Sequence, residues 1–357
     1  MEELTEVYKP RKILFRDEEV NELKERIRFY KEKKIVTNII IHGGSGSGKT
    51  TIINAITDET QDCLYLSCAN TQSSKKIFRK LYNSEFSKII ERFKQEPKIF
   101  IFDEINKIKD LTEFFDDINT FYRQVQSPII LITNRQDINK KMPDDARLTL
   151  FFEKIFFKSY NALQIKEILK ERLKEARENG KIVPEIPEGA FSFISALAIS
   201  QGSIRLAFRL LNEAIESEKF SVEDIEKDFA RIQREEVLCW IETLNETEKM
   251  VLKGLIEIPL SHQYDNKFIN EVEYSELAKY LFEKTPIKTS ARLSQILWRF
   301  QYDDIVIKTK DIWLGRAGGK RKVISIISEE MFATLLGIFF PNYEDLGYID
   351  NKNKGYK

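Results

Sequence analysis

Short apolar runs and longer amphipathic stretches alternate along the first 160 residues of the chain. The apolar runs are rich in isoleucine and phenylalanine, which favours buried strands. In the stretches between them apolar residues recur at helical spacing, as at Val20, Leu23 and Ile27 in the segment 16–30. This alternation predicts an α/β domain with a parallel sheet. The expected strands are residues 39–41, 63–68, 98–102, 127–134 and 154–160, with a further helix over residues 75–93.

From residue 161 the pattern is helical. Asn161 and Gln164 have the spacing of a capping box at the start of the first helix. About 75 residues of helices that follow a parallel-sheet domain are typical of the lid of AAA+ ATPases. The other expected helices cover residues 189–200, begin after Gly202, and run from Ser221 past Trp240.

A third module begins after Thr243 and contains three expected helices and a hairpin. Its third helix opens at Thr289 or Ser290 and carries a buried stripe, with Ala291, Arg292, Gln295 and Arg299 on or beside the exposed face. Helices, a turn and a glycine-rich hairpin in this order predict a winged helix. The expected elements are helices from Asn245 through Ile256 and over residues 274–283, strands at 305–310 and 323–328, and the stripe Leu293, Ile296, Leu297 and Phe300.

Composition limits the classes of protein that this pattern allows. The chain has 357 residues, no net charge and three cysteines without metal-ligand spacing, which favours a reduced cytosol. The sequence has neither a signal-peptide pattern nor an apolar run long enough to span a membrane. The charge is uneven, because residues 285–322 hold nine lysines and arginines against three aspartates, a net charge of +6. Local basicity of this kind suits contact with DNA.

One motif indicates nucleotide binding. The apolar run 39–41 leads into Gly-x-x-x-x-Gly-Lys-Thr, followed by an apolar helix. Glycines bring backbone N–H groups close to phosphates, the lysine reaches the β- and γ-phosphates, and the threonine hydroxyl can ligate Mg²⁺. A glycine-rich surface turn is the alternative, and the strand and helix around the motif argue against it. The residues expected to bind ATP or ADP here are Gly43, Gly44, Ser45, Gly46, Ser47, Gly48, Lys49, Thr50 and Thr51.

Two strand ends carry candidate catalytic residues. Asp103 and Glu104 follow the run 98–102, where the aspartate can hold Mg²⁺ and the glutamate can polarise the attacking water. A solvated strand end is the other reading of this pair. Asn134 ends the next strand, which we expect to lie between the Asp103 strand and the P-loop strand. There it can hold the lytic water or sense the γ-phosphate, and a turn-initiating asparagine is the alternative.

Two arginines are candidates for reaching the γ-phosphate. Arg205 opens the helix after Gly202, where it can couple the lid to the bound nucleotide. Arg147 has a place in the chain where an arginine finger can be displayed to a neighbouring subunit. For both, a solvated surface arginine is the alternative. Residues 1–15 are expected to lie against the nucleotide domain.

The hairpin segment 315–322 suits contact with DNA. It contains three glycines and four cations and no acid, so its backbone can approach phosphates or the minor groove. A solvated charge run is the usual alternative. In the preceding helix, Arg292 and Gln295 are the expected base readers. The full set of expected DNA contacts is Thr289, Ser290, Arg292, Gln295, Arg299, Arg316, Lys320, Arg321 and Lys322.

Several stretches resemble the archaeal replication initiators related to the eukaryotic origin recognition complex and its Cdc partner, which are AAA+ proteins. They are Tyr8-Lys-Pro with Phe15–Glu18, the P-loop, Phe102–Asn106, Ile132–Asn134, the Tyr-Asn-Ala segment at Ser159–Ala162 with Ile168, Leu169 and Arg172, and the hairpin tip Gly-Arg-Ala-Gly-Gly. The resemblance covers almost the whole chain. It implies that Tyr160 and Arg172 are further nucleotide contacts.

The sequence also departs from this family. The segment between Cys68 and Lys98 is short beside the family's usual helical insertion, which contacts DNA from the ATPase domain. Gly-Ser-Ile-Arg replaces the usual Gly-Asp-Ala-Arg around Arg205, and the proline that commonly precedes the finger arginine is missing at Arg147.

We therefore expect an α/β P-loop AAA+ base, an α-helical lid and a C-terminal winged-helix domain. The expected boundaries are 1–160 for the base, 161–235 for the lid, 236–345 for the DNA-binding domain and 346–357 for a polar tail.

The expected function is that of an origin-binding replication initiator, with ATP or ADP and Mg²⁺ as cofactors and slow, switch-like ATP hydrolysis. Double-stranded origin DNA, a replicative helicase and paralogous initiators are the expected partners. The expected location is the cytoplasm, at the nucleoid and away from membranes. Two alternatives stay open: a diverged paralogue that acts as a regulator or repressor, and a signalling AAA+ ATPase whose winged helix docks a protein.

Overall fold

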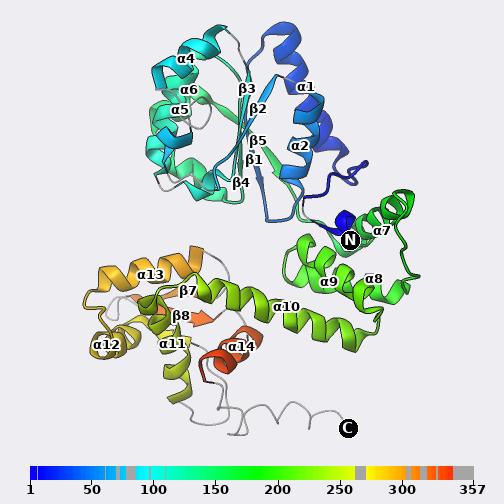
Figure 1. Ribbon diagram of the computed structural model, residues 1–357. Coiled ribbons are helices and arrows are strands. Elements are labelled where there is room, and N and C mark those ends of the chain that lie inside the picture. The colour runs from blue at the N-terminus through cyan, green and yellow to red at the C-terminus, as the bar shows by residue number, and fades with distance from the viewer. Residues whose placement is uncertain are drawn as a thin grey trace. The chain divides into compact units, whose positions relative to one another are not determined.

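The protein is described from a computed structural model of two compact units, Met1–Asp228 and Phe229–Lys357 (Figure 1). The division falls within one continuous helix, α10 (Val222–Glu242). The structure describes residues 1–5, 7–60, 62–69, 73–77, 86–95, 98–108, 110–261, 271–302, 307–313, 320–326 and 329–340.

A parallel sheet in the order β2-β3-β4-β1-β5 forms the centre of the first unit. All five predicted strands are confirmed. The prediction that a further strand separates the P-loop strand from the Asp103 strand is also confirmed, because β4 pairs with both β1 and β3. The strands are β1 (Asn38–Gly43), β2 (Cys63–Ser67), β3 (Ile99–Asp103), β4 (Ile129–Thr133) and β5 (Phe152–Phe157).

Two helical layers cover this sheet, with α1 and α2 on one face and α4, α5 and α6 on the other (Figure 1). The side chains of β1 alternate between the two layers, since Ile39 and Ile41 join one core cluster and Ile40 joins the other. Both faces of the sheet are therefore buried, as expected for near-continuous apolar strands. The helices are α1 (Asp17–Lys33), α2 (Lys49–Glu59), α4 (Phe86–Gln95), α5 (Leu111–Val125) and α6 (Asp144–Leu150), with the short helices η2 (Ile105–Lys107) and η3 (Gln136–Lys141).

Three helices that we name the lid helices follow β5: α7 (Ala162–Glu178), α8 (Glu188–Ser200) and α9 (Ile204–Ser217). The predicted capping box at the start of α7 is confirmed, because Asn161 and Gln164 each bond the backbone N–H of the other. The Ser221 cap of α10 is also confirmed, by its bond from the Asp224 N–H at 3.1 Å.

The expectation that residues 1–15 lie against the nucleotide domain is wrong for the start of the chain. The short helix η1 (Glu2–Leu4) packs on α7 and α9, and the Met1 amino group donates to Asn212 Oδ1 at 2.5 Å. Lys9, further along, does reach the base, where its ammonium pairs with Asp58 on α2 at 2.6 Å. The N-terminal segment therefore joins the lid helices to the base.

The second unit surrounds one hydrophobic core with helices and an antiparallel sheet in the order β6-β8-β7. The predicted stripe is confirmed: Leu293, Ile296, Leu297 and Phe300 are each at most 2% exposed. The hairpin strands are longer than predicted, and their register places Trp313 opposite Lys320. The elements are α11 (Glu246–Ser261), β6 (Glu271–Glu273), α12 (Tyr274–Lys284), α13 (Ser290–Tyr302), β7 (Ile307–Trp313), β8 (Lys320–Ile326) and α14 (Glu329–Phe339).

Besides the short helices η1, η2 and η3, four elements were not among those predicted: α5, α6, β6 and α14. In β6 three residues are too few to show a period of two, and α14 follows strand β8 after only two residues. The predicted helix over residues 75–93 is seen in part, as helical residues 74–77 and as α4, and residues 78–85 lie outside the described part. None of the helices in the described part is long and apolar enough to cross a membrane.

Candidate nucleotide-binding site and nucleic-acid interface

A cavity of about 570 Å³ lies in the first unit, beside the loop between β1 and α2. Its lining joins the loop to residues from β2, β3, β4, the N-terminal segment, α7 and α9. A volume of this size suits a small ligand such as a nucleotide. The predicted site residues on this wall are Ser45, Gly46, Ser47, Gly48, Lys49, Thr50, Thr51, Asp103, Glu104, Asn134, Tyr160, Arg172 and Arg205.

Glycine is required at two positions of the loop. Gly48 has a φ of +90°, and a Cβ there would lie 2.8 Å from the Tyr160 hydroxyl. A Cβ on Gly43 would lie 2.8 Å from the Phe157 carbonyl oxygen of the neighbouring strand. The loop can therefore follow its tight path, packed against Phe157 and Tyr160, only with these glycines.

The Lys49 ammonium is held inside the loop. It donates to the carbonyl oxygens of Gly43 at 2.8 Å and Gly44 at 2.7 Å, and lies 3.3 Å from Ser47 Oγ. Burial lowers the pKa of Lys49 to about 8, with Asp103 acting in the opposite direction. The helix α2 begins at the same residue, so its unpaired N–H groups and positive end also face an anion bound in the loop.

Asp103 is the centre of a polar network at the carboxyl end of β3. Its Oδ2 accepts hydrogen bonds from the Thr50 hydroxyl at 2.8 Å and from the Tyr65 hydroxyl at 2.7 Å. Its Oδ1 accepts from the Glu104 N–H at 2.8 Å, and the residue is 3% exposed. A carboxylate beside the threonine hydroxyl is the donor set that Mg²⁺ prefers. Sequence reasoning missed Tyr65, which lies 38 positions from Asp103 in the chain.

Glu104 has an unusual backbone conformation. Its φ of +57° and ψ of +40° lie in the left-handed region, where glutamate is rare. The side chain is exposed and lines the cavity next to Asp103. Such conformations are concentrated at functional sites because the surrounding structure must maintain them.

The two predicted phosphate sensors both line the cavity and come from different elements. Asn134 follows β4 on the base. Arg205 comes from α9, and its guanidinium Nη1 lies 3.4 Å from Ser45 Oγ in the P-loop. Arg205 therefore links the lid helices to the loop.

Tyr160 and Arg172, which the resemblance implied, also line this cavity. Arg16 supports Tyr160, with its guanidinium 4.2 Å from the ring centroid and its Nε donating to the Tyr160 hydroxyl at 3.2 Å. Sequence reasoning missed Arg16 as a supporting residue, since 144 positions separate the two. Arg172 is 8% exposed, its guanidinium lies 4.9 Å from the ring centroid of Tyr8 and 5.3 Å from that of Phe208, and burial lowers its pKa. Its Nη1 has no hydrogen-bond partner within the described part of the chain.

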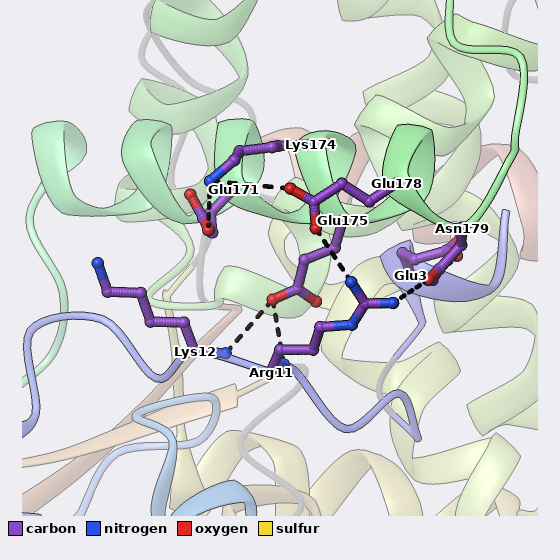
Figure 2. Close-up of polar contacts among 8 residues, drawn as sticks. All are labelled: Glu3, Arg11, Lys12, Glu171, Lys174, Glu175, Glu178 and Asn179. Carbon is purple, nitrogen blue, oxygen red and sulfur yellow. Dashed lines mark hydrogen bonds and ion pairs between the residues drawn. The ribbon is translucent and has the colours of Figure 1, made fainter.

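One carboxylate on α7 holds the N-terminal segment over the cavity. Figure 2 shows Glu175 pointing at the backbone of this segment, where its Oε1 accepts from the N–H groups of Arg11 at 3.1 Å and Lys12 at 3.4 Å. The Arg11 guanidinium continues the contact to Glu178 at 3.0 Å and to Asn179 at 2.5 Å. Glu175 is only 2% exposed, so these bonds are shielded from water. Residues 7–10 and 12–14 thereby form one wall of the cavity.

Arg147, the predicted arginine finger, does not line this cavity. Its guanidinium pairs with Asp144 at 2.9 Å and donates to the Met142 carbonyl oxygen at 3.0 Å. The side chain remains half exposed on α6, and its action on a neighbouring subunit stays a prediction.

The exposed face of α13 contains two arginines in different surroundings. Arg292 is exposed and donates to Gln295 Oε1 at 2.8 Å, so the two predicted base readers are bonded to each other. The Arg299 guanidinium instead contacts both carboxylate oxygens of Glu248 at 2.6 and 2.7 Å. Glu248 is buried and forms the capping box of α11 with Asn245. Arg299 therefore joins α13 to α11.

The remaining predicted DNA contacts lie at the start of α13 and in the hairpin. Thr289 and Ser290 are exposed, and the Thr289 hydroxyl accepts from the Arg292 N–H at 3.3 Å. Lys320 and Arg321 belong to β8, where Arg321 pairs with Ile312. The Lys322 ammonium lies 5.7 Å from the ring centroid of Tyr274. Arg316 lies outside the described residues.

Comparison with known proteins agrees with the resemblance seen in the sequence. A family model described as an AAA domain matches residues 36–144. The ORC1-type DNA replication protein of Picrophilus torridus is 25% identical, over 71% of this chain and 69% of that protein. The protein of the same name from Pyrococcus abyssi is 22% identical, over 90% of this chain and 85% of its own length. The predicted resemblance to archaeal replication initiators is confirmed.

The similarity extends to the fold of the whole chain. The ORC1 protein of Aeropyrum pernix, solved in complex with DNA, matches 96% of this chain with a TM-score of 0.74 and 19% identity. The match covers 97% of the length of that ORC1 protein. The ORC2 protein of the same organism matches with a TM-score of 0.55. The archaeal initiator fold therefore includes both compact units, and the AAA domain lies in the first.

Proposed function

We propose that this protein is an origin-binding replication initiator whose DNA binding and helicase recruitment are switched by ATP binding and slow hydrolysis. The observation that carries the proposal is the composition of one cavity wall. One cavity is lined both by the base and by a lid helix. The base contributes the P-loop, Asp103, Glu104 and Asn134, and the lid helix contributes Arg205. A nucleotide in that space contacts both the base and the lid helices. Its phosphates can therefore determine how the lid helices are oriented on the base.

The nucleotide chemistry follows from the types of residue and their places. The loop N–H groups and Lys49 bind the phosphates, and the hydroxyl of Thr50 with the carboxylate of Asp103 would hold Mg²⁺. Mg²⁺ held there would neutralise charge on the phosphate oxygens. Glu104 orients and polarises the attacking water, while Asn134 and Arg205 contact the transferred phosphoryl group. Tyr160 and Arg172 bind other parts of the nucleotide.

The switch depends on differential contact. Arg205 can contact a γ-phosphate only when ATP is present. ATP and ADP therefore stabilise different orientations of the lid helices on the base. A ligand shifts such an equilibrium by its difference in affinity for the two states. Slow hydrolysis is sufficient for this role, because the nucleotide acts as a signal and its turnover does no work.

For DNA we propose that the second unit acts as a winged helix. Its α13 would enter the major groove with Arg292 and Gln295 toward the bases, and the hairpin with Arg316, Lys320, Arg321 and Lys322 would follow the adjacent minor groove. Thr289 and Ser290 at the start of α13 suit phosphate contact. The relatives named ORC1-type DNA replication proteins and the ORC1 structure with DNA support this assignment.

The deciding experiment is a footprint on the origin DNA of the source organism, with and without ATP. The proposal expects protection of a defined origin site that changes between ATP and ADP and loses this dependence in Lys49→Ala. Protection confined to promoters would favour the repressor-like paralogue. Absence of any protected site would contradict the proposal and favour a signalling ATPase that docks protein.

A further inference from the structure

One contact in the nucleotide cavity is not explained by the P-loop motif or by the Asp-Glu pair. Tyr65 lies on β2, the strand next to β3, and its hydroxyl donates to Asp103 Oδ2 at 2.7 Å. The register pairs Ser67 with Asp103, so Tyr65 lies two residues before the level of the carboxylate. Two strand residues span about 6.6 Å, a gap that the long tyrosine side chain can bridge.

This hydroxyl determines which part of the Asp103 carboxylate remains open. A carboxylate has about four lone-pair positions. Within the described residues, Oδ2 accepts from Tyr65 and from Thr50, while Oδ1 accepts from the Glu104 N–H. The fourth position is therefore on Oδ1, an oxygen that it shares with the Glu104 N–H bond. Without the tyrosine hydroxyl, one position on Oδ2 would be open as well, and the carboxylate would be held only by Thr50 and the Glu104 N–H.

The ring of Tyr65 is 36% exposed and lines the cavity. It therefore does not fill the hydrophobic core. The main contribution of its hydroxyl oxygen is to orient the Asp103 carboxylate. A tyrosine hydroxyl is a hydrogen-bond donor, and here it donates to the Asp103 carboxylate.

We propose that Tyr65 is a positioning residue for the divalent cation, holding Asp103 so that Oδ1 faces the metal or its bound water. The inference rests on the proposed nucleotide function and adds to it a residue that neither sequence motif includes. Tyr65 itself touches neither the phosphates nor the metal in this scheme. Its effect is on the concentration of Mg²⁺ that the site needs.

The test compares Tyr65→Phe with wild type in two titrations. The first measures binding of a fluorescent ATP analogue in EDTA, and the second measures how binding and ATP turnover rise with Mg²⁺. Tyr65→Phe should bind the analogue in EDTA within about twofold of wild type, because phosphate contacts are kept. It should need about tenfold more Mg²⁺ for half-maximal effect, as expected for the loss of one hydrogen bond to a charged group.

Tyr122→Phe is the matched control. Tyr122 lies on α5, is half-buried and packs against a core cluster away from the cavity lining, so both titrations should match wild type. An unchanged Mg²⁺ midpoint in Tyr65→Phe would overturn this inference alone. Equal weakening in EDTA and in Mg²⁺ would also overturn it, since that result indicates a structural role. A wild-type chain that binds no nucleotide would overturn the proposed function together with the inference.

Discussion

The nucleotide cavity and the exposed face of α13 are assembled in different ways. The cavity gathers side chains from segments between Thr5 and Phe208, and many of them are buried or bonded to one another. The α13 face is a single helix surface on which Arg292 and Gln295 are exposed. Substitutions in the cavity should therefore cause large losses of nucleotide binding or hydrolysis. Substitutions on α13 should have smaller effects, on stability at one residue and on DNA binding at another.

The largest effect is expected for Lys49→Ala. The lysine is the half-buried cation of the loop, where its ammonium bonds the Gly43 and Gly44 carbonyl oxygens, so its loss removes the charged donor expected to bond phosphate. We expect roughly 100-fold weaker ATP binding in a fluorescence titration, corresponding to about 3 kcal/mol. Binding within a factor of three of wild type would contradict the placement of nucleotide in this loop.

Glu104→Gln should separate binding from hydrolysis. The amide keeps the size of the side chain but cannot accept a proton, so turnover should fall roughly 100-fold or more while ATP affinity stays near wild type. Single-turnover hydrolysis beside equilibrium binding gives both numbers. Normal turnover would remove Glu104 from the proposed catalytic role.

Arg299→Ala tests the structural part of the α13 face. It leaves the buried Glu248 carboxylate without its guanidinium, which should destabilise the second unit by about 2 kcal/mol. We expect the melting transition of this unit to fall by roughly 5–10 °C. A variant as stable as wild type would show that the pair between α13 and α11 contributes little.

Arg292→Ala is the counterpart on the same helix. The Arg292 guanidinium bonds its exposed neighbour Gln295, and alanine keeps the backbone N–H that bonds Thr289, so thermal stability should change little. DNA affinity should fall about tenfold and sequence preference should relax, because one bidentate base contact is worth roughly 1–3 kcal/mol. Competition binding with mutated sites measures both. A uniform loss across all sequences would assign Arg292 to phosphate contact.

The smallest effect concerns pH. The pKa of Lys49 is about 8, so the lysine is mostly charged at pH 7 and mostly neutral at pH 9. Affinity for ATP should therefore fall by several-fold, up to about tenfold, as pH rises from 7 to 9. DNA affinity of the second unit is the comparison over the same range and should vary less. An ATP affinity that does not change between pH 7 and pH 9 would contradict this prediction. It would show that bound phosphate keeps Lys49 charged over the whole range.

Features that depend on neighbouring residues could be predicted from the sequence, and contacts between distant residues could not. The five strands, the lid capping box and the α13 stripe follow from local periodicity, and all were predicted. The P-loop and Asp103 could be proposed as site residues from the sequence, because each lies in one short motif of neighbouring residues. Arg16, Tyr65 and Glu175 were missed as supporting residues. Each acts on a partner at least 38 positions away, and no local pattern encodes such a contact.

The sequence by itself determined the parallel sheet, the phosphate loop and the amphipathic helices, since period and motif express forces between near neighbours. Tertiary structure decided which polar groups meet. It turned Arg299 toward the buried Glu248 while Arg292 stayed exposed on the same helix. It also brought the N-terminal segment across the cavity and placed the Tyr65 hydroxyl on Asp103. These pairings depend on how helices and strands pack, because a buried charge or hydroxyl must find a partner wherever the fold provides one.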